Sequence, residues 1–255
     1  NENEYISFMF EDGAQFYYTG EETIKAIFEK EITGYTNPEG NDGYYLIANP
    51  TERVQNDEYD ALDGCAQFDL YTFDPTAAFE WVNKGSTDHK VLFERNVGYL
   101  FASAATTTLQ FRGELRPAGE ATIDDLKYYD GNEAGHEFPG FNLIGNPFAC
   151  NAYVQNYSFY TIEGDAVVAG TGAIAPCQGF MIETDEDKVA VELTTQAPEP
   201  AAAPSTMSIE VNQNRGNVID RAIVNFNGNN DLHKFMMNPA HTNISLAKNG
   251  EEFAA

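Results

Sequence analysis

The octapeptide GYYLIANP at residues 43–50 returns at residues 140–147 as GFNLIGNP. Six of the eight positions agree in identity or aromatic character, and the Leu-Ile and Asn-Pro pairs are identical. Proline has no backbone N–H to give to a strand ladder, and it disfavours helical backbone in the residue before it. Each copy therefore predicts a strand that enters the core at Leu-Ile and ends at Asn-Pro.

Each copy is followed by the same landmarks in the same order. These are a Tyr/Phe-rich strand, then a strand that begins with glycine, and then one segment of alternating apolar residues. In the first copy these are residues 69–74, 98–102 and 108–111, and in the second they are residues 157–161, 179–183 and 189–192. Landmarks that recur in one order indicate an internal duplication of structural rather than catalytic character. The apolar anchors of these strands should be buried: Leu46, Ile47, Leu100, Leu143, Ile144 and Phe180.

Two-residue alternation and short apolar runs, bounded by Gly, Asn, Asp and Pro, extend along nearly the whole chain. This pattern predicts an all-β protein with two tandem β-sandwich or jelly-roll-like units related by the repeat. Strands are expected at residues 5–10, 44–48, 66–73, 98–102, 107–112, 141–145, 158–162, 179–183, 189–193, 207–211, 221–226 and 243–246.

The segment at residues 21–32 fits two structures. Ile24, Ile27 and Phe28 have helical spacing, whereas Ile24, Ala26 and Phe28 alternate as in a strand. We favour a strand because of the β-branched content and the turn that follows, with a short helix as the alternative.

The composition changes at residues 196–204, QAPEPAAAP, where proline fixes an extended, semi-rigid spacer. We predict a first unit at residues 1–120, a second, repeat-related unit at 121–196, a linker at 197–204 and a C-terminal β segment at 205–255. Three expected strands make a thin core. The last segment should therefore pack on the preceding sheets and belong to a longer module.

The charge balance limits the partners. The chain has 14 Lys and Arg against 40 Asp and Glu, a formal charge of −26 over 255 residues. Nucleic acids and anionic membranes are bound by clustered Lys and Arg, so neither is an expected partner. Apolar residues make up 42% of the chain, which is enough for a folded core, but no run is long enough to predict a spanning helix. Recognition should then use loop tips, aromatic edges or an added β-strand.

We find no sequence pattern for catalysis or for a cofactor. No Gly-x-Ser-x-Gly motif, phosphate loop or dinucleotide fingerprint occurs. Glycoside hydrolysis needs two facing carboxylates, but in a chain with 40 Asp and Glu their presence is no evidence of that activity. The four histidines stand singly in polar contexts and should be solvated: His89, His136, His233 and His241. We expect a noncatalytic protein without a cofactor.

The cysteines and acidic clusters give no metal site. Cys65, Cys150 and Cys177 have no zinc-site spacing, and an odd count allows one disulfide at most. We favour Cys150 with Cys177, because both flank segments that the duplication should bring together. The acidic clusters should be solvated turns, since none matches a twelve-residue calcium loop: residues 124–125, 130–133 and 185–187.

Aromatic side chains offer another kind of site. Trp81 with Tyr71, or Tyr17 with Tyr18, would be able to stack on a sugar ring. With 14 Tyr and 18 Phe in the chain, packing is the expected role of most aromatic residues.

Several of these segments together resemble large secreted or cell-surface proteins of Bacteroidetes that are described as adhesin-like. The segments are residues 43–50, 69–71, 81–83, 98–102, 109–115 and 140–148. The closing stretches DRAIVNF at 220–226 and GEEFA at 250–254 look like the part that such proteins carry before a C-terminal sorting or anchoring region. In the family pattern, further strands would follow after Ala255.

The resemblance implies a secreted or cell-surface location, outside the outer membrane, and a noncatalytic role in adhesion or surface assembly. The partner would be a protein or glycan of a host or neighbouring cell, with no nucleic acid and no direct membrane insertion. A carbohydrate-binding module of a glycan-capture or glycan-degrading system is the alternative. The oligomeric state is open, although an exposed strand edge in the C-terminal segment would favour pairing between chains.

Overall fold

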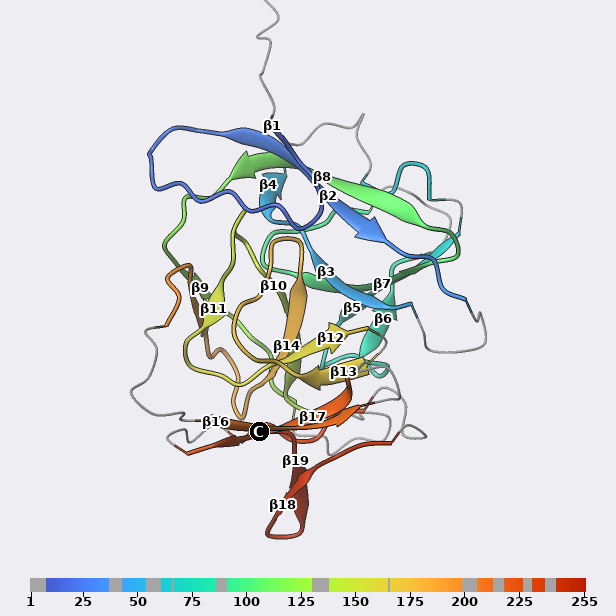
Figure 1. Ribbon diagram of the computed structural model, residues 1–255, viewed down its shortest axis with the longest axis vertical. Helices are drawn as coiled ribbons and strands as arrows, with labels where there is room; N and C mark the ends of the chain where they lie inside the picture. Colours follow the sequence, from blue (N-terminus) through green and yellow to red (C-terminus); the bar gives the residue numbers. More distant parts are fainter. Residues whose placement is uncertain are drawn as a thin grey trace, which may run out of the picture.

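The computed structural model describes residues 8–36, 43–53, 61–65, 67–85, 91–129, 138–164, 166–198, 206–212, 218–226, 231–236 and 242–255. These residues form strands and turns without a helix, so the predicted all-β class is confirmed. Within them, accordingly, no helix is long and apolar enough to cross a membrane. The strands of residues 8–194 form four small sheets, an arrangement that resembles the four blades of a propeller (Figure 1).

The first two sheets are built from β1 to β8. The strands are β1 (Phe8–Phe10), β2 (Lys25–Ile32), β3 (Tyr45–Ala48), β4 (Thr51–Arg53), β5 (Phe68–Phe73), β6 (Trp81–Asn83), β7 (Gly98–Ser103) and β8 (Thr107–Leu115). One sheet has the order β1-β2-β8-β4, and the other has the order β3-β7-β5-β6.

The next two sheets are built from β9 to β15. The strands are β9 (Glu120–Ile123), β10 (Phe141–Gly145), β11 (Tyr153–Val154), β12 (Tyr160–Glu163), β13 (Ala166–Ala169), β14 (Gly179–Glu183) and β15 (Val191–Thr194). Their orders are β10-β14-β12-β13 and β11-β15-β9.

The pairing pattern repeats. Adding seven to each strand number turns the order β3-β7-β5-β6 into β10-β14-β12-β13, and β4-β8-β2 into β11-β15-β9. The two Leu-Ile segments lie in the corresponding strands β3 and β10, and each pairs antiparallel with a glycine-led strand, β7 or β14. We call β2 to β8 (residues 25–115) the first repeat and β9 to β15 (residues 120–194) the second repeat. The duplication predicted from the sequence is present in the strand pairing.

The Asn-Pro pairs end their strands as predicted, and the asparagine side chain explains how. Asn146 is fully buried, and its Nδ2 donates to the carbonyl oxygens of Cys150, Ile174 and Ala175 at 3.0, 2.9 and 3.0 Å. Its Oδ1 accepts from the backbone N–H of Phe148 at 3.0 Å. Asn49 makes fewer such bonds, with Nδ2 donating to the Phe93 carbonyl at 3.0 Å. The side chain thus satisfies backbone groups that a ladder no longer pairs.

The two repeats meet at their Leu-Ile strands. Isolated bridges join Ile47 to Gln178 and Val97 to Ile144. A Cβ at Gly98 would lie 2.7 Å from the Ile144 carbonyl oxygen, and one at Gly179 would lie 3.0 Å from the Ile47 carbonyl oxygen. Glycine leads β7 and β14 because another backbone approaches at that point. The six predicted anchor residues are all buried: Leu46, Ile47, Leu100, Leu143, Ile144 and Phe180.

Residues 21–32 contain a strand, β2, in which Ala26 and Phe28 are buried on one face. The strand that we favoured for this segment is therefore confirmed. The short strands β4, β9, β11 and β13 were not predicted, and neither was β6. The predicted strand at 243–246 overlaps only the start of β18, and part of the predicted strand at 5–10 lies outside the described residues.

The C-terminal segment, residues 206–255, packs on the second repeat as expected. It contains β16 (Thr206–Asn212), β17 (Val218–Asn225), β18 (Leu246–Lys248) and β19 (Glu251–Phe253), which form two hairpin ribbons below the sheets in Figure 1. Strand β17 lies against β13. Ile223, Phe235 and Ala254 share a buried cluster with Leu143 and Tyr160.

Candidate functional site

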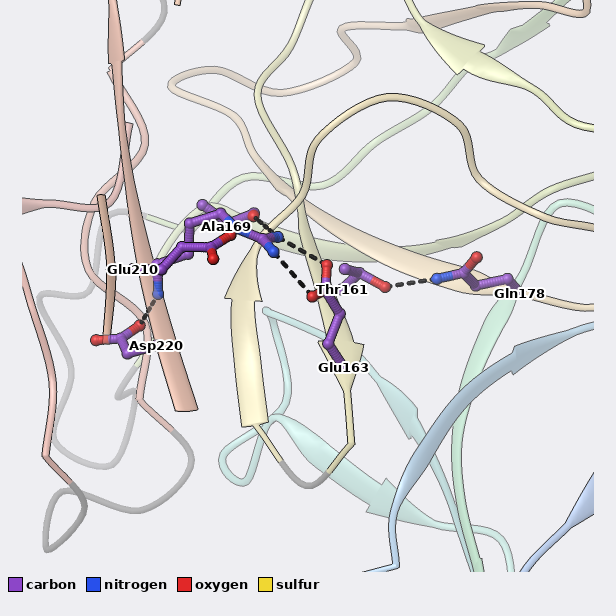
Figure 2. A network of polar contacts seen from close by, with 7 residues as sticks. Thr161, Glu163, Ala169, Gln178, Glu210 and Asp220 are labelled. Carbon is purple, nitrogen blue, oxygen red and sulfur yellow. Dashed lines mark hydrogen bonds and ion pairs between the residues drawn. The ribbon is translucent and has the colours of Figure 1, made fainter. Parts of the chain in front are cut away.

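A network of charged groups fastens the C-terminal segment to the second repeat (Figure 2). The Arg221 side chain is 6% exposed, and its guanidinium donates to both carboxylate oxygens of Glu163 at 2.7 and 2.8 Å. It also donates to Glu210 at 2.9 Å and to the Ala169 carbonyl at 3.0 Å. The hydrogen bonding of the Arg221 guanidinium to Glu163 is the main cause that raises the pKa of Arg221. This bidentate fork is a structural clamp between β17 and the hairpin β12–β13.

A second ion pair lies deeper. The Nζ atom of Lys234 is 2.6 Å from both carboxylate oxygens of Asp220, and the two side chains are 3% and 4% exposed. The backbone N–H groups of Arg221 and Ile244 donate to the same carboxylate at 2.8 and 2.5 Å. A buried charge needs such partners to offset its desolvation. We assign this pair to the fold.

His233 is the one predicted loop histidine within the described residues, and its side chain is 46% exposed, as expected for a solvated histidine, although it also has partners in the fold. Its Nδ1 lies 2.6 Å from one carboxylate oxygen of Glu183, and its backbone N–H donates to the other oxygen at 2.8 Å. The centroid of its ring lies 4.5 Å from that of Phe253. Its carbonyl oxygen accepts from the hydroxyl of Tyr160 at 2.7 Å. Burial raises the pKa of Glu183, while the bonds to His233 oppose that rise. His89, His136 and His241 lie outside the described residues.

The disulfide favoured from the sequence is absent, which corrects that prediction. Cys65, Cys150 and Cys177 are buried and not joined to one another. Cys150 packs in the core of the second repeat with Phe148, whereas Cys177 packs in the core of the first repeat. Burial raises the pKa of Cys150 to about 11 and also raises that of Cys177. These thiols stay protonated and act as small apolar groups.

The acidic clusters form no metal centre among the residues that the structure describes, where no three His, Cys, Asp or Glu side chains are suitably grouped. In the cluster at 185–187, Asp187 instead accepts from the backbone N–H of Tyr128 at 2.8 Å. The cluster at 130–133 lies outside the described residues.

The aromatic pairs singled out from the sequence differ in exposure. Trp81 packs edge-on against Phe73 at 4.9 Å, and with Tyr71 it lies half-buried against the shared core. Tyr18 donates its hydroxyl to the Leu115 carbonyl at 2.6 Å, whereas Tyr17 is 62% exposed. Tyr17 alone among these four side chains is mainly open to solvent.

Tyr17 lies in the loop that follows an exposed apolar strand edge. Phe8 and Met9 of β1 are 50% and 57% exposed, and β1 is the outermost strand of its sheet, parallel to β2. Phe10 of the same strand stacks on the buried Phe28 at 4.6 Å, which anchors the strand to the core. We call Phe8, Met9 and Tyr17 the β1 edge. The alternating residues of this segment predicted the strand, but only Tyr17 was considered for binding.

A polar hollow of about 400 Å³ lies on the outer face of the sheet β11-β15-β9. The side chains that line it are mostly acidic, amide and hydroxyl groups: Glu120, Thr122, Gln155, Glu192, Thr194 and Gln196, with Ala121, Leu193, Ala197 and Pro198 completing the wall. None of these side chains was predicted to bind a ligand, because their grouping depends on the register of β9, a strand that was not predicted.

Comparison with known proteins finds no matching family model, no similar curated protein and no similar solved structure. The resemblance to adhesin-like proteins of Bacteroidetes therefore stays a prediction, and the candidate sites must be judged by their own chemistry.

Proposed function

We propose that the protein is a noncatalytic surface protein, secreted or held outside the outer membrane, that acts in adhesion or surface assembly through the β1 edge. The observation that carries this proposal is the exposure of Phe8 and Met9 on an outermost strand, and of Tyr17 in the loop that follows it. The partner would be a protein or glycan of a host or neighbouring cell.

The β1 edge has the physical properties of a contact surface. An outermost strand has unpaired backbone N–H and C=O groups, and proteins commonly shield such an edge with charged residues or proline. Here the strand carries phenylalanine and methionine instead, and burying apolar area contributes about 25 cal/mol per Å². Addition of a partner strand would pair the backbone and bury Phe8 and Met9 at once.

The net charge supports a partner that is recognised by shape and apolar contact. At −26, the protein should bind DNA and sialylated glycans weakly, and added salt should help binding or leave it unchanged by screening repulsion over about 10 Å at 0.1 M. DNA binding that salt abolishes would contradict this expectation.

The test uses beads coated with the protein and a panel of immobilised extracellular-matrix proteins. We expect at least one surface to retain the beads, and the double variant Phe8→Ser/Met9→Ser to reduce retention at least tenfold. Phe79→Ser is the matched control, because Phe79 is 82% exposed and lies between β5 and β6, strands of another sheet. Retention that is equal for wild type and edge variant would overturn the assignment of the β1 edge.

We also propose that each repeat is a β-sandwich or jelly-roll-like unit, with the boundaries 1–120, 121–196, 197–204 and 205–255. In the first repeat one buried cluster draws Phe28 and Phe111 from one sheet and Ile47 and Phe101 from the other. The second repeat has its own cluster. Limited proteolysis should cut first within residues 197–204.

A further inference from the structure

We propose that the polar hollow on the sheet β11-β15-β9 binds a neutral oligosaccharide. This is a second binding function, independent of the β1 edge and carried by different residues. It rests on the register of three strands, on the kind of groups that line the hollow, and on a contrast with the corresponding sheet of the first repeat.

The register places polar side chains in two rows. Thr194 of β15 lies opposite Glu120 of β9 on one side and Tyr153 of β11 on the other. Glu192 lies opposite Thr122, and the backbone N–H of Gln155 donates to the Glu192 carbonyl at 2.9 Å. Neighbouring strands lie about 4.8 Å apart, and residues two apart on one strand are separated by about 7 Å. The face is therefore a grid of polar groups at regular spacing.

The intervening residues hold this grid rigidly. Ala121, Val191 and Leu193 alternate with the polar residues and are buried in the core of the second repeat. The wall is fixed by the N–H of Gln196, which donates to the Thr194 hydroxyl at 3.2 Å. A binding site built on packed strands loses little freedom when a ligand binds.

The lining groups match a ligand rich in hydroxyls. Each carboxylate accepts hydrogen bonds from hydroxyl groups, while the glutamine amides and threonine hydroxyls both donate and accept. The lining contains no Lys or Arg, and Glu120 and Glu192 would repel an anionic sugar. The ligand that fits is an uncharged saccharide.

The corresponding sheet of the first repeat is different on its outer face. Glu29 there accepts from the Gln110 amide at 2.8 Å, and Lys25 lies 4.0 Å from the Glu114 carboxylate. In that sheet the acidic and polar groups bond to one another. The hollow of the second repeat leaves the side chains of Glu120 and Glu192 exposed to solvent.

The test is binding to a glycan array of neutral, sialylated and sulfated saccharides, followed by electrophoresis in gels that contain a retained neutral polysaccharide. We expect neutral saccharides alone to be retained, and Glu192→Gln with Thr122→Ala to weaken retention at least tenfold. Glu114→Gln, a charge removal on the corresponding strand β8, is the matched control and should bind like the wild type. Thermal melting checks that the variants are folded.

Three results would overturn the proposal: no neutral saccharide retained at millimolar concentration, a preference for sialylated or sulfated saccharides, or undiminished binding by the Glu192→Gln/Thr122→Ala variant. The Phe8→Ser/Met9→Ser variant separates the two proposals, since it should lose retention on matrix proteins and keep its saccharide binding. Loss of both activities in that variant would contradict an independent saccharide site.

Discussion

The two repeats share their strand pairing but differ at their edges and outer faces. In the first repeat β2 is extended by the parallel strand β1, whereas the corresponding strand β9 is the last strand of its sheet among the described residues. In the second repeat β13 is covered by β17, while β6 ends the corresponding sheet. The strand pairing and the buried anchor residues are common to both repeats, and core packing tolerates little change. Edges and outer faces are less constrained, and both proposed sites lie there.

The largest expected effect comes from the buried ion pair between Lys234 and Asp220 in the C-terminal segment, which packs on the second repeat. Lys234→Ala should cost about 3 to 5 kcal/mol, because it leaves the Asp220 carboxylate buried without a counter-ion. Denaturant unfolding measures the loss. Hydrogen exchange should become faster in β12 and β13 and remain unchanged in β5 and β6. The double variant Lys234→Met/Asp220→Leu should recover much of the stability, and equal loss in both variants would argue against an electrostatic origin.

The next prediction tests the equivalence of the Leu-Ile strands. Leu143→Ala and Leu46→Ala should each cost about 2 to 5 kcal/mol, since both side chains are buried in the same cluster. Chemical denaturation of the two variants gives the comparison. An unchanged melting temperature for Leu143→Ala would count against the duplicated core.

The Asn-Pro turns should differ in strength. Asn146→Ala removes a side chain that bonds four backbone groups and should cost about 3 kcal/mol. Asn49→Ala removes one donated bond and the bonds it accepts from Thr51, and should cost about 1 to 2 kcal/mol. Thermal unfolding of both variants measures the gap. A larger loss for Asn49→Ala would reverse this part of the comparison.

The smallest expected effect is a difference in pH dependence. Burial raises the pKa of Glu183 above 4.5, so its contribution to stability is full below that pH and is lost as the pH rises through the folded pKa. For Asp74, burial is outweighed by hydrogen bonds from Thr76 and Lys127, which lower the pKa below 3.8. Its contribution is present above pH 3.8 and is lost as the pH falls through the folded pKa.

Stability curves from pH 2 to pH 8 should therefore change in different regions. Asp74→Asn should flatten the fall at acid pH, and Glu183→Gln should flatten the decline above pH 4.5. Curves that change in the same region for both variants would contradict the opposite signs of the two pKa shifts.

The sequence predicted the fold class and the duplication because Leu-Ile, Asn-Pro and the leading glycines act locally, within one strand and the turn that ends it. It missed β11 because two residues, Tyr153 and Val154, cannot display alternation. The setting of His233 was hidden because its partner Glu183 is 50 residues away in the chain. The prediction of a Cys150–Cys177 disulfide was wrong for a similar reason. Nearness of two strands does not reveal which core each side chain enters.

The candidate sites depended even more on long-range structure. Tyr17 and Tyr18 are adjacent in sequence, yet the bond from Tyr18 to Leu115 turns one ring inward and leaves the other exposed. The polar hollow exists only once β9 is in register with β15, and no local pattern specifies that register.

Hydrogen exchange of the protein bound to the matrix protein that retains it tests the β1 edge most directly. We expect slower exchange at the amides of β1 and of residues 16–18, with β15 unchanged, because the added partner lies along the first repeat. Protection confined to β9, β11 and β15, or absent from β1, would contradict the claim that this edge makes the contact.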